Sequence, residues 1–448
     1  MTRELVLGIL LEVTRDGEYS HIALRNVLGK YQYLDKKERA FITRVTEGTL
    51  EHMIEIDYII NQFSNVKVNK MKPVIRCIMR SAVYQLKYMD SVPDSAVCNE
   101  AVKLATKKGF HTLKGFVNGV LRNIARNIDK IEYPSKENYV EYLSVKYSMP
   151  TWILTEWLDA FDKKTVECIL EDFLKEKPTT IRCNLNQCTV EELVETLRNE
   201  EVTVEKHPYL PYALWISGYD YLADLMSFQT GMFYVQDISS MLVAHLADPK
   251  QGDTVIDVCA APGGKSIHVA ELLKGTGRVE ARDLTDYKVG LIQGNIERTQ
   301  MQNMTAVKWD ATVLDEDTVG TADIVIADLP CSGLGVMGKK TDLKYKMTLD
   351  SAKELAALQK EILAKVQAYV KPEGTLVYST CTVHVRENME NVNWFLKQYP
   401  EFELVPIQTL LPEELRESVE KEGCLQFIPG VHKSDGFFIA KFRKVKHG

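Results

Sequence analysis

Apolar residues recur at helical spacing along the first part of the chain. Leu7 and Leu10 stand near the start of this pattern, and Leu121 and Ile124 stand near its end. Apolar positions three or four residues apart lie on one face of a helix, where they can be buried together. Several such stretches, joined by short polar segments, predict an all-α domain over residues 1–130.

The helical pattern stops at polar residues around Pro134, which indicates a linker. Residues 140–232 then combine helix-like stretches with two short runs of β-prone residues, Thr179–Asn184 and Ala213–Ile216. This mixture predicts a small α/β subdomain with a small, RRM-like sheet. We expect it to bridge the helical domain and the remainder of the chain.

Strand-like and helix-like stretches alternate through residues 233–444. Such alternation predicts an α/β fold of the Rossmann-like type, a mostly parallel sheet with helices on both faces. Ligands of these sheets bind beyond the carboxyl ends of the strands. Residues that follow a predicted strand are therefore the candidates for chemistry. The predicted strands are 254–258, 278–282, 304–308, 323–328, 375–380 and 437–443.

The loop after the first of these strands consists of small residues and leads into a helical pattern. Small side chains let a ligand approach the backbone and leave the amides at the helix start free to face it. The loop has neither the dinucleotide G-x-G-x-x-G pattern nor the phosphate-loop pattern. A nucleoside-like ligand is expected instead, and S-adenosylmethionine fits. The predicted binding residues in this loop are Cys259, Ala260, Ala261, Pro262, Gly263, Gly264 and Lys265.

Two acidic residues follow the second and third predicted strands. Asp283 comes 20 positions after Gly263, about the spacing at which a carboxylate reaches the ribose hydroxyls of a nucleotide. Asp310 stands where nucleoside-binding sheets contact the adenine amino group. An aspartate after a strand is also a common turn former, so both roles remain open for Asp310.

Two cysteines follow the fourth and fifth predicted strands. Cys331 comes shortly after Asp328, and Cys381 comes directly after Thr380. A free cysteine usually acts as a small apolar residue. Adjacent strands lie about 5 Å apart, however, so both thiols and Asp328 should converge on one cleft.

Paired thiols beside a carboxyl group suit methylation of cytosine at C5. This carbon is too weakly nucleophilic to attack a methyl sulfonium directly. A thiolate that adds at C6 makes C5 nucleophilic, a carboxyl group can assist at N3, and a second thiol can help the first to leave. Spacing alone does not decide which thiol attacks.

Charge is divided unevenly along the chain. The net charge is −7, but residues 1–130 contain 21 Lys and Arg against 14 Asp and Glu, a local excess of +7. This asymmetry indicates an anionic partner for the N-terminal domain, although a solvated basic face is the alternative. Arg76 and Arg80 are spaced to share a helix face and are candidates for phosphate contacts.

The cysteine pattern and the hydropathy argue against a disulfide-bonded secreted protein, a zinc protein and a membrane protein. The nine cysteines are scattered without a C-x-x-C pair, and no apolar stretch is long enough to span a bilayer. We expect a reduced, cytoplasmic protein with no membrane association and no metal site.

Ordered motifs make the chain resemble the RNA cytosine-C5 methyltransferase family of the Sun/Fmu type. They are Cys-Ala-Ala-Pro-Gly-Gly-Lys at 259–265, Asp-Leu-Pro-Cys-Ser-Gly-Leu-Gly at 328–335 and Ser-Thr-Cys-Thr at 379–382. Glu387-Asn388 and Asp435-Gly436-Phe437-Phe438 extend the match. The N-terminal part resembles the helical RNA-binding domain of the antitermination factor NusB, at 37–41, 84–86 and 115–122.

The resemblance implies roles for individual residues. In this family the thiol at the position of Cys381 is the nucleophile and the one at Cys331 assists release, whereas in DNA cytosine methyltransferases the Pro-Cys thiol attacks. Asp328 would contact S-adenosylmethionine or the target base. Lys339 and Lys340 stand in a loop that differs from the family's usual Arg-Arg-x-Pro-Asp but keeps its positive charge, and so can contact RNA.

The implied function is S-adenosylmethionine-dependent methylation of C5 of a specific cytosine in bacterial 16S rRNA. A monomer acting on free rRNA or on a partly assembled small subunit is expected. Two alternatives remain open. One is the same chemistry on tRNA, and the other is a non-catalytic RNA-binding or antitermination factor.

Overall fold

The computed structural model describes residues 1–419 and 421–445 and divides the chain into two compact units. The first unit comprises Met1–Leu174 with Met337–Thr348, and the second comprises Lys175–Val336 with the chain from Leu349 onward. No helix in the described part of the chain is long and apolar enough to cross a membrane.

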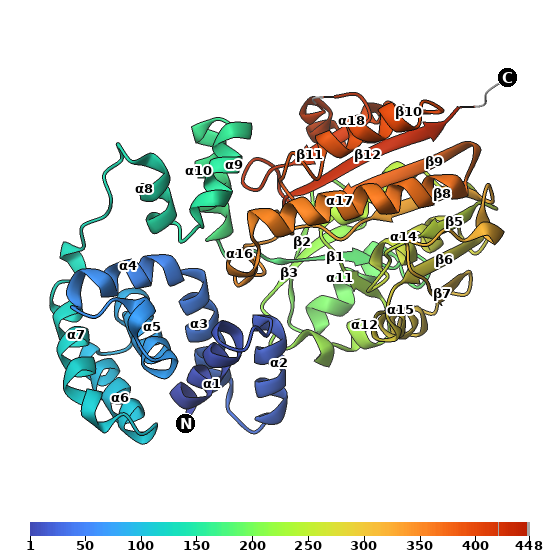
Figure 1. The fold of residues 1–448 in the computed structure, drawn as a ribbon. Helices are drawn as coiled ribbons and strands as arrows, with labels where there is room; N and C mark the ends of the chain where they lie inside the picture. The colour runs from blue at the N-terminus through green and yellow to red at the C-terminus, as the bar shows by residue number, and fades with distance from the viewer. Residues whose placement is uncertain (420, 446–448) are drawn as a thin grey trace. The chain divides into compact units, whose positions relative to one another are not determined.

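The first unit is helical, as the sequence predicted for its N-terminal part (Figure 1). Its helices are α1 (Thr2–Thr14), α2 (Ser20–Lys30), α3 (Lys36–Glu51), α4 (Met53–Phe63), α5 (Pro73–Tyr88), α6 (Asp94–Lys107), α7 (Lys114–Arg126), α8 (Tyr139–Lys146), α9 (Thr151–Ala160), α10 (Lys163–Phe173) and α16 (Leu343–Lys346).

Helix α5 is the central element of this unit. It begins with Pro73, whose fixed φ suits the first helical position. It packs against α1, α3, α4, α6 and α7, and most of its residues are buried, including Ile78 and Val83. Gly48 of α3 allows this packing, because a Cβ there would lie 2.1 Å from the ring of Tyr84.

The segment Met337–Thr348 packs among the helices of the first unit, although it follows a strand of the second unit in sequence. The Asp342 carboxylate accepts hydrogen bonds from the backbone N–H (3.1 Å) and hydroxyl (2.7 Å) of Ser20. The Lys344 ammonium donates to the Glu51 carbonyl at 2.8 Å. Specific long-range contacts therefore hold this segment in place.

The second unit contains a large, mostly parallel sheet with strand order β10-β12-β9-β8-β5-β6-β7, and β11 pairs with β12. The strands β9, β8, β5, β6 and β7 are parallel to one another, whereas β12 is antiparallel to β9. The strands are β5 (Thr254–Asp257), β6 (Arg278–Asp283), β7 (Met304–Lys308), β8 (Ala322–Asp328), β9 (Val370–Thr380), β10 (Phe402–Leu404), β11 (Cys424–Phe427) and β12 (Phe437–Lys444). The predicted parallel fold and the six predicted strands are confirmed, while β10 and β11 were not predicted.

Alternate residues of the central strands face opposite sides of this sheet, as the strand period requires. Val255 and Ile324 join a core with α13 (Ile238–Ala247) and α14 (Gly264–Leu272), whereas Ile256 and Val325 join a core with α17 (Leu349–Val366) and α18 (Met389–Gln398). Helix α15 (Asp286–Thr299) belongs to the first of these cores through Ile292. Helices thus cover both faces, as Figure 1 shows for α17 and α14.

A smaller antiparallel sheet of order β2-β3-β1-β4 also belongs to the second unit. Its strands are β1 (Thr179–Cys183), β2 (Thr203–Lys206), β3 (Ala213–Ser217) and β4 (Phe233–Val235), accompanied by α11 (Val190–Asn199) and α12 (Met226–Gln229). Leu193 and Leu197 of α11 are buried against Ile181 and Ile216. The prediction grouped residue 140 onward with this sheet, whereas the structure clusters α8, α9 and α10 with the helical unit.

Candidate active site

The small-residue loop lies between β5 and α14, where the sequence placed it. Gly263 has a φ of +105°, a conformation that glycine adopts without strain. A Cβ on Gly264 would lie 2.9 Å from the ring of Tyr234. The Ala260 N–H donates to the Arg282 carbonyl at 2.8 Å, which ties the loop to the end of β6. Small residues are therefore needed here for close packing as well as for ligand access.

Asp283 ends β6 and is nearly fully buried beside this loop. One carboxylate oxygen accepts the Ala261 N–H at 2.9 Å and the other accepts the Leu284 N–H at 2.8 Å. The Lys288 ammonium lies 3.0 Å from the same carboxylate. The structure thus brings Asp283 and the loop together, as the spacing predicted.

Asp310 follows β7 and shapes a turn. Its carboxylate accepts the hydroxyl of Thr312 at 2.7 Å and the N–H of Thr312 at 2.9 Å. These hydrogen bonds lower the pKa of Asp310. Asp310 therefore has the turn-forming role that the sequence left open. Both of these hydrogen bonds go to the same carboxylate oxygen, Oδ1.

The two thiols meet at the carboxyl ends of β8 and β9, as expected from neighbouring strands. The Sγ atoms of Cys331 and Cys381 lie 3.1 Å apart, and the Cys381 N–H donates to the Cys331 sulfur at 3.3 Å. Asp328 is the register partner of Ser379 and accepts its hydroxyl at 2.7 Å. The hydrogen bond with Cys381 and burial raise the pKa of Cys331 well above its usual range.

Lys265 has a position that the sequence did not reveal. The sequence assigned it to the cofactor loop, but its ammonium nitrogen lies 2.7 Å from the Asp328 carboxylate. Burial is the largest single influence and lowers the pKa of Lys265, but the charge of Asp328, the hydrogen bond to it and the charges of Asp257 and Cys381 together outweigh burial, so the pKa is raised. A partly buried cation therefore lies among the candidate catalytic residues. The motif contained Lys265, but only the fold shows which carboxylate it pairs with.

Sequence reasoning also missed Arg182 of β1. Its side chain is fully buried, and it donates to both carboxylate oxygens of Glu271 on α14, at 3.1 and 2.8 Å. A third bond of 3.0 Å reaches the Gly264 carbonyl at the start of α14. The small sheet is thereby joined to the helix that begins in the candidate cofactor loop.

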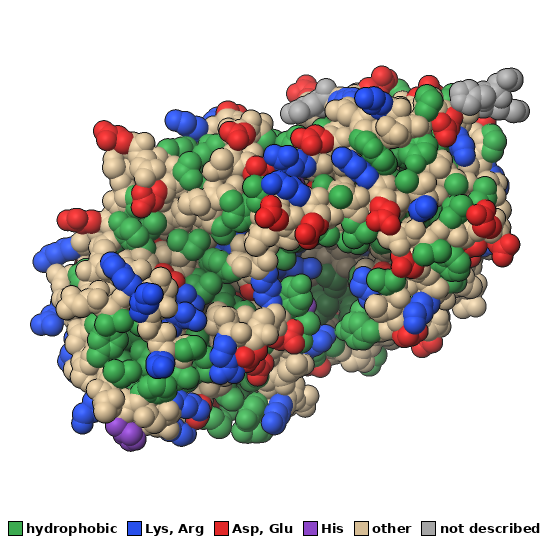
Figure 2. All heavy atoms as spheres, viewed as in Figure 1, with side chains coloured by type: hydrophobic (Ala, Val, Ile, Leu, Met, Phe, Trp, Pro, Cys, Tyr) green, Lys and Arg blue, Asp and Glu red, His purple; other side chains and the backbone are tan. Residues whose placement is uncertain are grey.

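The position of Arg80 differs from the surface position that a predicted RNA contact requires. It shares α5 with Arg76, as predicted, but it is buried and makes two hydrogen bonds of 2.7 and 2.6 Å to the Asp57 carboxylate. Its guanidinium is therefore engaged in an internal ion pair. Lys339 and Lys340 are exposed in the Met337–Thr348 segment. Figure 2 shows basic side chains outnumbering acidic ones over the helices of the first unit on the face drawn.

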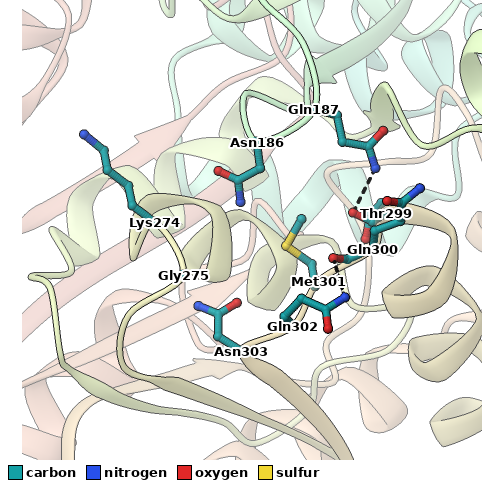
Figure 3. Close-up of a pocket in the computed structure, with 9 residues that line it drawn as sticks. All are labelled: Asn186, Gln187, Lys274, Gly275, Thr299, Gln300, Met301, Gln302 and Asn303. Atoms are coloured by element: carbon teal, nitrogen blue, oxygen red, sulfur yellow. Dashed lines mark hydrogen bonds between the residues drawn. The ribbon is translucent and has the colours of Figure 1, made fainter.

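A cavity of about 370 Å³ lies elsewhere on the second unit (Figure 3). Its lining is rich in side-chain amides, which several labelled residues direct toward the open space. Within the large sheet these residues precede β6 and β7, so the cavity is at the amino ends of those strands, whereas the thiols are at the carboxyl ends of β8 and β9. It is therefore separate from the thiol site. The lining residues are Asn186, Gln187, Lys274, Gly275, Thr299, Gln300, Met301, Gln302 and Asn303.

The residues at the loop fit a nucleoside-type cofactor. The loop offers backbone groups and small side chains. Asp283 ends β6 and Asp310 follows the adjacent strand β7, and both offer carboxylates to hydroxyl and amino donors. The parallel sheet, this loop and the thiol pair together define the class of S-adenosylmethionine-dependent methyltransferases.

Comparisons with known proteins narrow the class. A family model described as 16S rRNA methyltransferase RsmB/F matches residues 244–443, a NusB family model matches residues 1–126, and an RsmF/B-like ferredoxin-like domain model matches residues 149–219. The chain is 37% identical to the probable ribosomal RNA small subunit methyltransferase B of Bacillus subtilis, over 99% of this chain and 98% of that protein. A Synechocystis protein of the same name is 31% identical over 99% of each chain. The chain therefore belongs to the RsmB/F family of rRNA methyltransferases.

Solved structures share the fold of this chain. The crystal structure of PH0851 is 27% identical, has a TM-score of 0.83, and matches 99% of this chain and 98% of that one. NSun6 from Pyrococcus horikoshii with SFG is 23% identical, has a TM-score of 0.57, and matches 70% of this chain and 99% of that one, which shows a shared fold. The protein is an S-adenosylmethionine-dependent rRNA methyltransferase.

Proposed function

We propose that the protein methylates C5 of a specific cytosine in bacterial 16S rRNA through a covalent bond between Cys381 and C6. The supporting observation is the thiol pair, with Sγ atoms 3.1 Å apart, beside the carboxylate of Asp328 and the ammonium of Lys265. The proposal places a monomer in the cytoplasm, where rRNA is made and assembled.

Each residue in this group has a distinct task. Cys381, as the thiolate, adds to C6 and shifts ring electrons toward C5. The Lys265 ammonium on α14, paired with the Asp328 carboxylate at the end of β8, provides a positive charge and N–H donors for the electron density that moves toward N3. S-adenosylmethionine, held by the loop at 259–264 and Asp283, supplies an electrophilic methyl group when bound.

Release reverses the addition. Loss of the C5 proton to a base returns an electron pair to the ring, and the bond between C6 and the Cys381 sulfur breaks. The Cys331 thiol lies close enough to donate a hydrogen bond to the departing sulfur. Without this donor, departure of the thiolate becomes slower and the adduct persists.

Single substitutions of the two thiols test this proposal. Cys331→Ala should yield an RNA-linked band on a denaturing gel, because attack and methyl transfer proceed while release stalls. Cys381→Ala should yield no adduct and no methylation, because no thiolate remains to add at C6. The reverse pattern would make Cys331 the nucleophile. Methylation by both variants without any adduct would exclude the covalent mechanism.

The RNA substrate is tested separately. Cytosine methylation should be mapped in 16S rRNA and in tRNA from a strain that lacks this protein. A single missing modification in 16S rRNA is expected, and it should return when purified protein is added to that rRNA. Loss of a tRNA modification alone would favour the tRNA alternative, and no loss in either RNA would favour a non-catalytic factor.

A further inference from the structure

A fully buried carboxylate, Glu387, lies behind the two thiols. One of its oxygens accepts the Ser332 N–H at 2.8 Å and the Gln359 amide at 2.9 Å. The other accepts the Ser332 hydroxyl and contacts Nδ1 of His384 at 3.0 Å. Burying a charge without partners is costly, and these contacts supply them. Both carboxylate oxygens of Glu387 are therefore held by specific partners within the fold.

These contacts connect Glu387 to both thiol-bearing strand ends. Ser332 directly follows Cys331, and its hydroxyl is hydrogen-bonded at 2.8 Å to the hydroxyl of Thr382, which directly follows Cys381. Gln359 adds a bond of 2.8 Å to the Pro330 carbonyl. A single buried group thus fixes how the two thiols lie relative to each other.

The charges around the thiol pair are asymmetric. The Glu387 carboxylate acts on Cys331 and adds to the rise in the pKa of that thiol, after the hydrogen bond with Cys381 and burial. The Lys265 ammonium interacts with Cys381 instead. Other titratable groups near the pair include Asp328, which is bonded to Lys265, Asp257, whose charge acts on Lys265, the His384 ring and the buried Tyr378 hydroxyl.

We propose, on the basis of the proposed function, that Glu387 is a positioning residue that selects the attacking thiol. Its carboxylate, hydrogen-bonded to Ser332 next to Cys331, disfavours loss of the proton from the Cys331 sulfur. Cys381 then ionises by releasing its own proton to water, and its thiolate accepts a hydrogen bond from Cys331. No carbon–sulfur bond is involved in this step.

Alkylation of the intact protein measures this selection without RNA. Iodoacetamide reacts with thiolates, so initial labelling rates of Cys331 and Cys381, read by peptide mass spectrometry from pH 6 to 9, report the ionisation of each thiol. In the wild type Cys381 should react first at neutral pH. In Glu387→Gln the ratio of the two rates should fall roughly tenfold or more, because one pKa unit changes the thiolate fraction about tenfold.

Matched variants separate charge from scaffolding. Glu390→Gln removes an exposed carboxylate three residues away and should leave the ratio unchanged. Ser332→Ala removes one hydrogen bond to Glu387 but keeps its charge, so the ratio should persist even where the melting temperature falls. If Ser332→Ala abolishes the selection as fully as Glu387→Gln, the charge role is wrong.

The remaining outcomes also decide the proposal. A folded Glu387→Gln protein that binds S-adenosylmethionine and keeps the wild-type labelling ratio would overturn it. If Glu387→Gln does not fold, Glu387→Asp takes its place: retained selectivity supports the proposal and lost selectivity overturns it. Methylation by both thiol variants without any RNA adduct, together with an altered ratio in Glu387→Gln, would refute the covalent function and leave the proton placement standing.

Discussion

Removing the guanidinium of Arg182 should destabilise the second unit strongly. Arg182 has no exposed surface and is hydrogen-bonded to both Glu271 oxygens and to the Gly264 carbonyl. Arg182→Met keeps much of the side-chain volume but removes the charge and these donors. The variant therefore leaves a carboxylate buried without a countercharge.

The expected cost follows from that uncompensated charge. Removing one partner of a buried ion pair costs about 3–5 kcal/mol, because the remaining ion stays desolvated. Burial already raises the pKa of Glu271, even though Arg182 opposes that rise. Without Arg182 the folded protein should favour neutral Glu271 further. The destabilisation should therefore be smaller at pH 5, where Glu271 takes up a proton more readily, than at pH 8.

A double-mutant cycle tests this expectation, with the free energy of unfolding measured by chemical denaturation for Arg182→Met, Glu271→Leu and the double variant. Each single variant should lose about 3–5 kcal/mol, and the double variant should recover most of that loss, because no unpaired charge remains. Arg278→Met, at an exposed position of β6, is the matched control. A loss below about 1 kcal/mol in Arg182→Met, or a double variant as unstable as the sum of the singles, would refute the reasoning.

Other predictions concern the cofactor, pH and RNA. Asp283→Ala should weaken S-adenosylmethionine binding by about 1.5–3 kcal/mol, the worth of hydrogen bonds to a charged group, and unchanged affinity in calorimetry would contradict the ribose assignment. Burial raises the pKa of Asp257 to about 7, above its value of about 4 in an unfolded chain. Its contribution to stability is thus full below pH 4 and lost as pH rises through 7. Asp257→Asn should show a flatter fall in melting temperature between pH 5 and 8, and a curve parallel to that of the wild type would reject this titration. Replacing Lys339 and Lys340 by Glu should weaken RNA binding. It should also make the slope of log K against log salt concentration shallower by roughly 0.7–0.9 for each lost phosphate contact. Arg80→Met should instead lower the melting temperature and leave this slope unchanged.

Strands of the parallel sheet such as β5 and β8 could be predicted because they are short runs of mainly apolar residues between turn residues. β7 was predicted with its observed bounds, Met304–Lys308. β10 was missed because its three residues are too few to show a pattern. The predicted subdomain of residues 140–232 also differs from the clustering of α8, α9 and α10 with the helical unit, whereas the ferredoxin-like domain model at residues 149–219 groups α9 and α10 with the small sheet. The clustering with the helical unit depends on long-range contacts such as the hydrogen bond from the Glu55 N–H to the Ser148 hydroxyl, which no local pattern encodes.

The candidate site was partly predictable for a topological reason. Parallel neighbours bring their carboxyl ends to one edge, so residues after β8 and β9 had to meet, and the sulfur atoms of Cys331 and Cys381 lie 3.1 Å apart. Partners that come from elsewhere could not be derived in this way. Arg80 looked like a surface cation because its helix spacing matched that of Arg76, yet its partner, Asp57, lies on α4.

The local sequence places both thiols at strand ends but does not distinguish one from the other. Each follows a strand of the same sheet, and each is next to a hydroxyl residue, Ser332 or Thr382, so the chain presents them almost symmetrically. The folded environment breaks this symmetry, because the anion Glu387 acts on one thiol and the cation Lys265 on the other. A thiolate is stabilised by a nearby cation and destabilised by an anion. Under the proposed mechanism, this difference in charge favours the thiolate of Cys381 over that of Cys331, which the labelling rates of the two thiols would test.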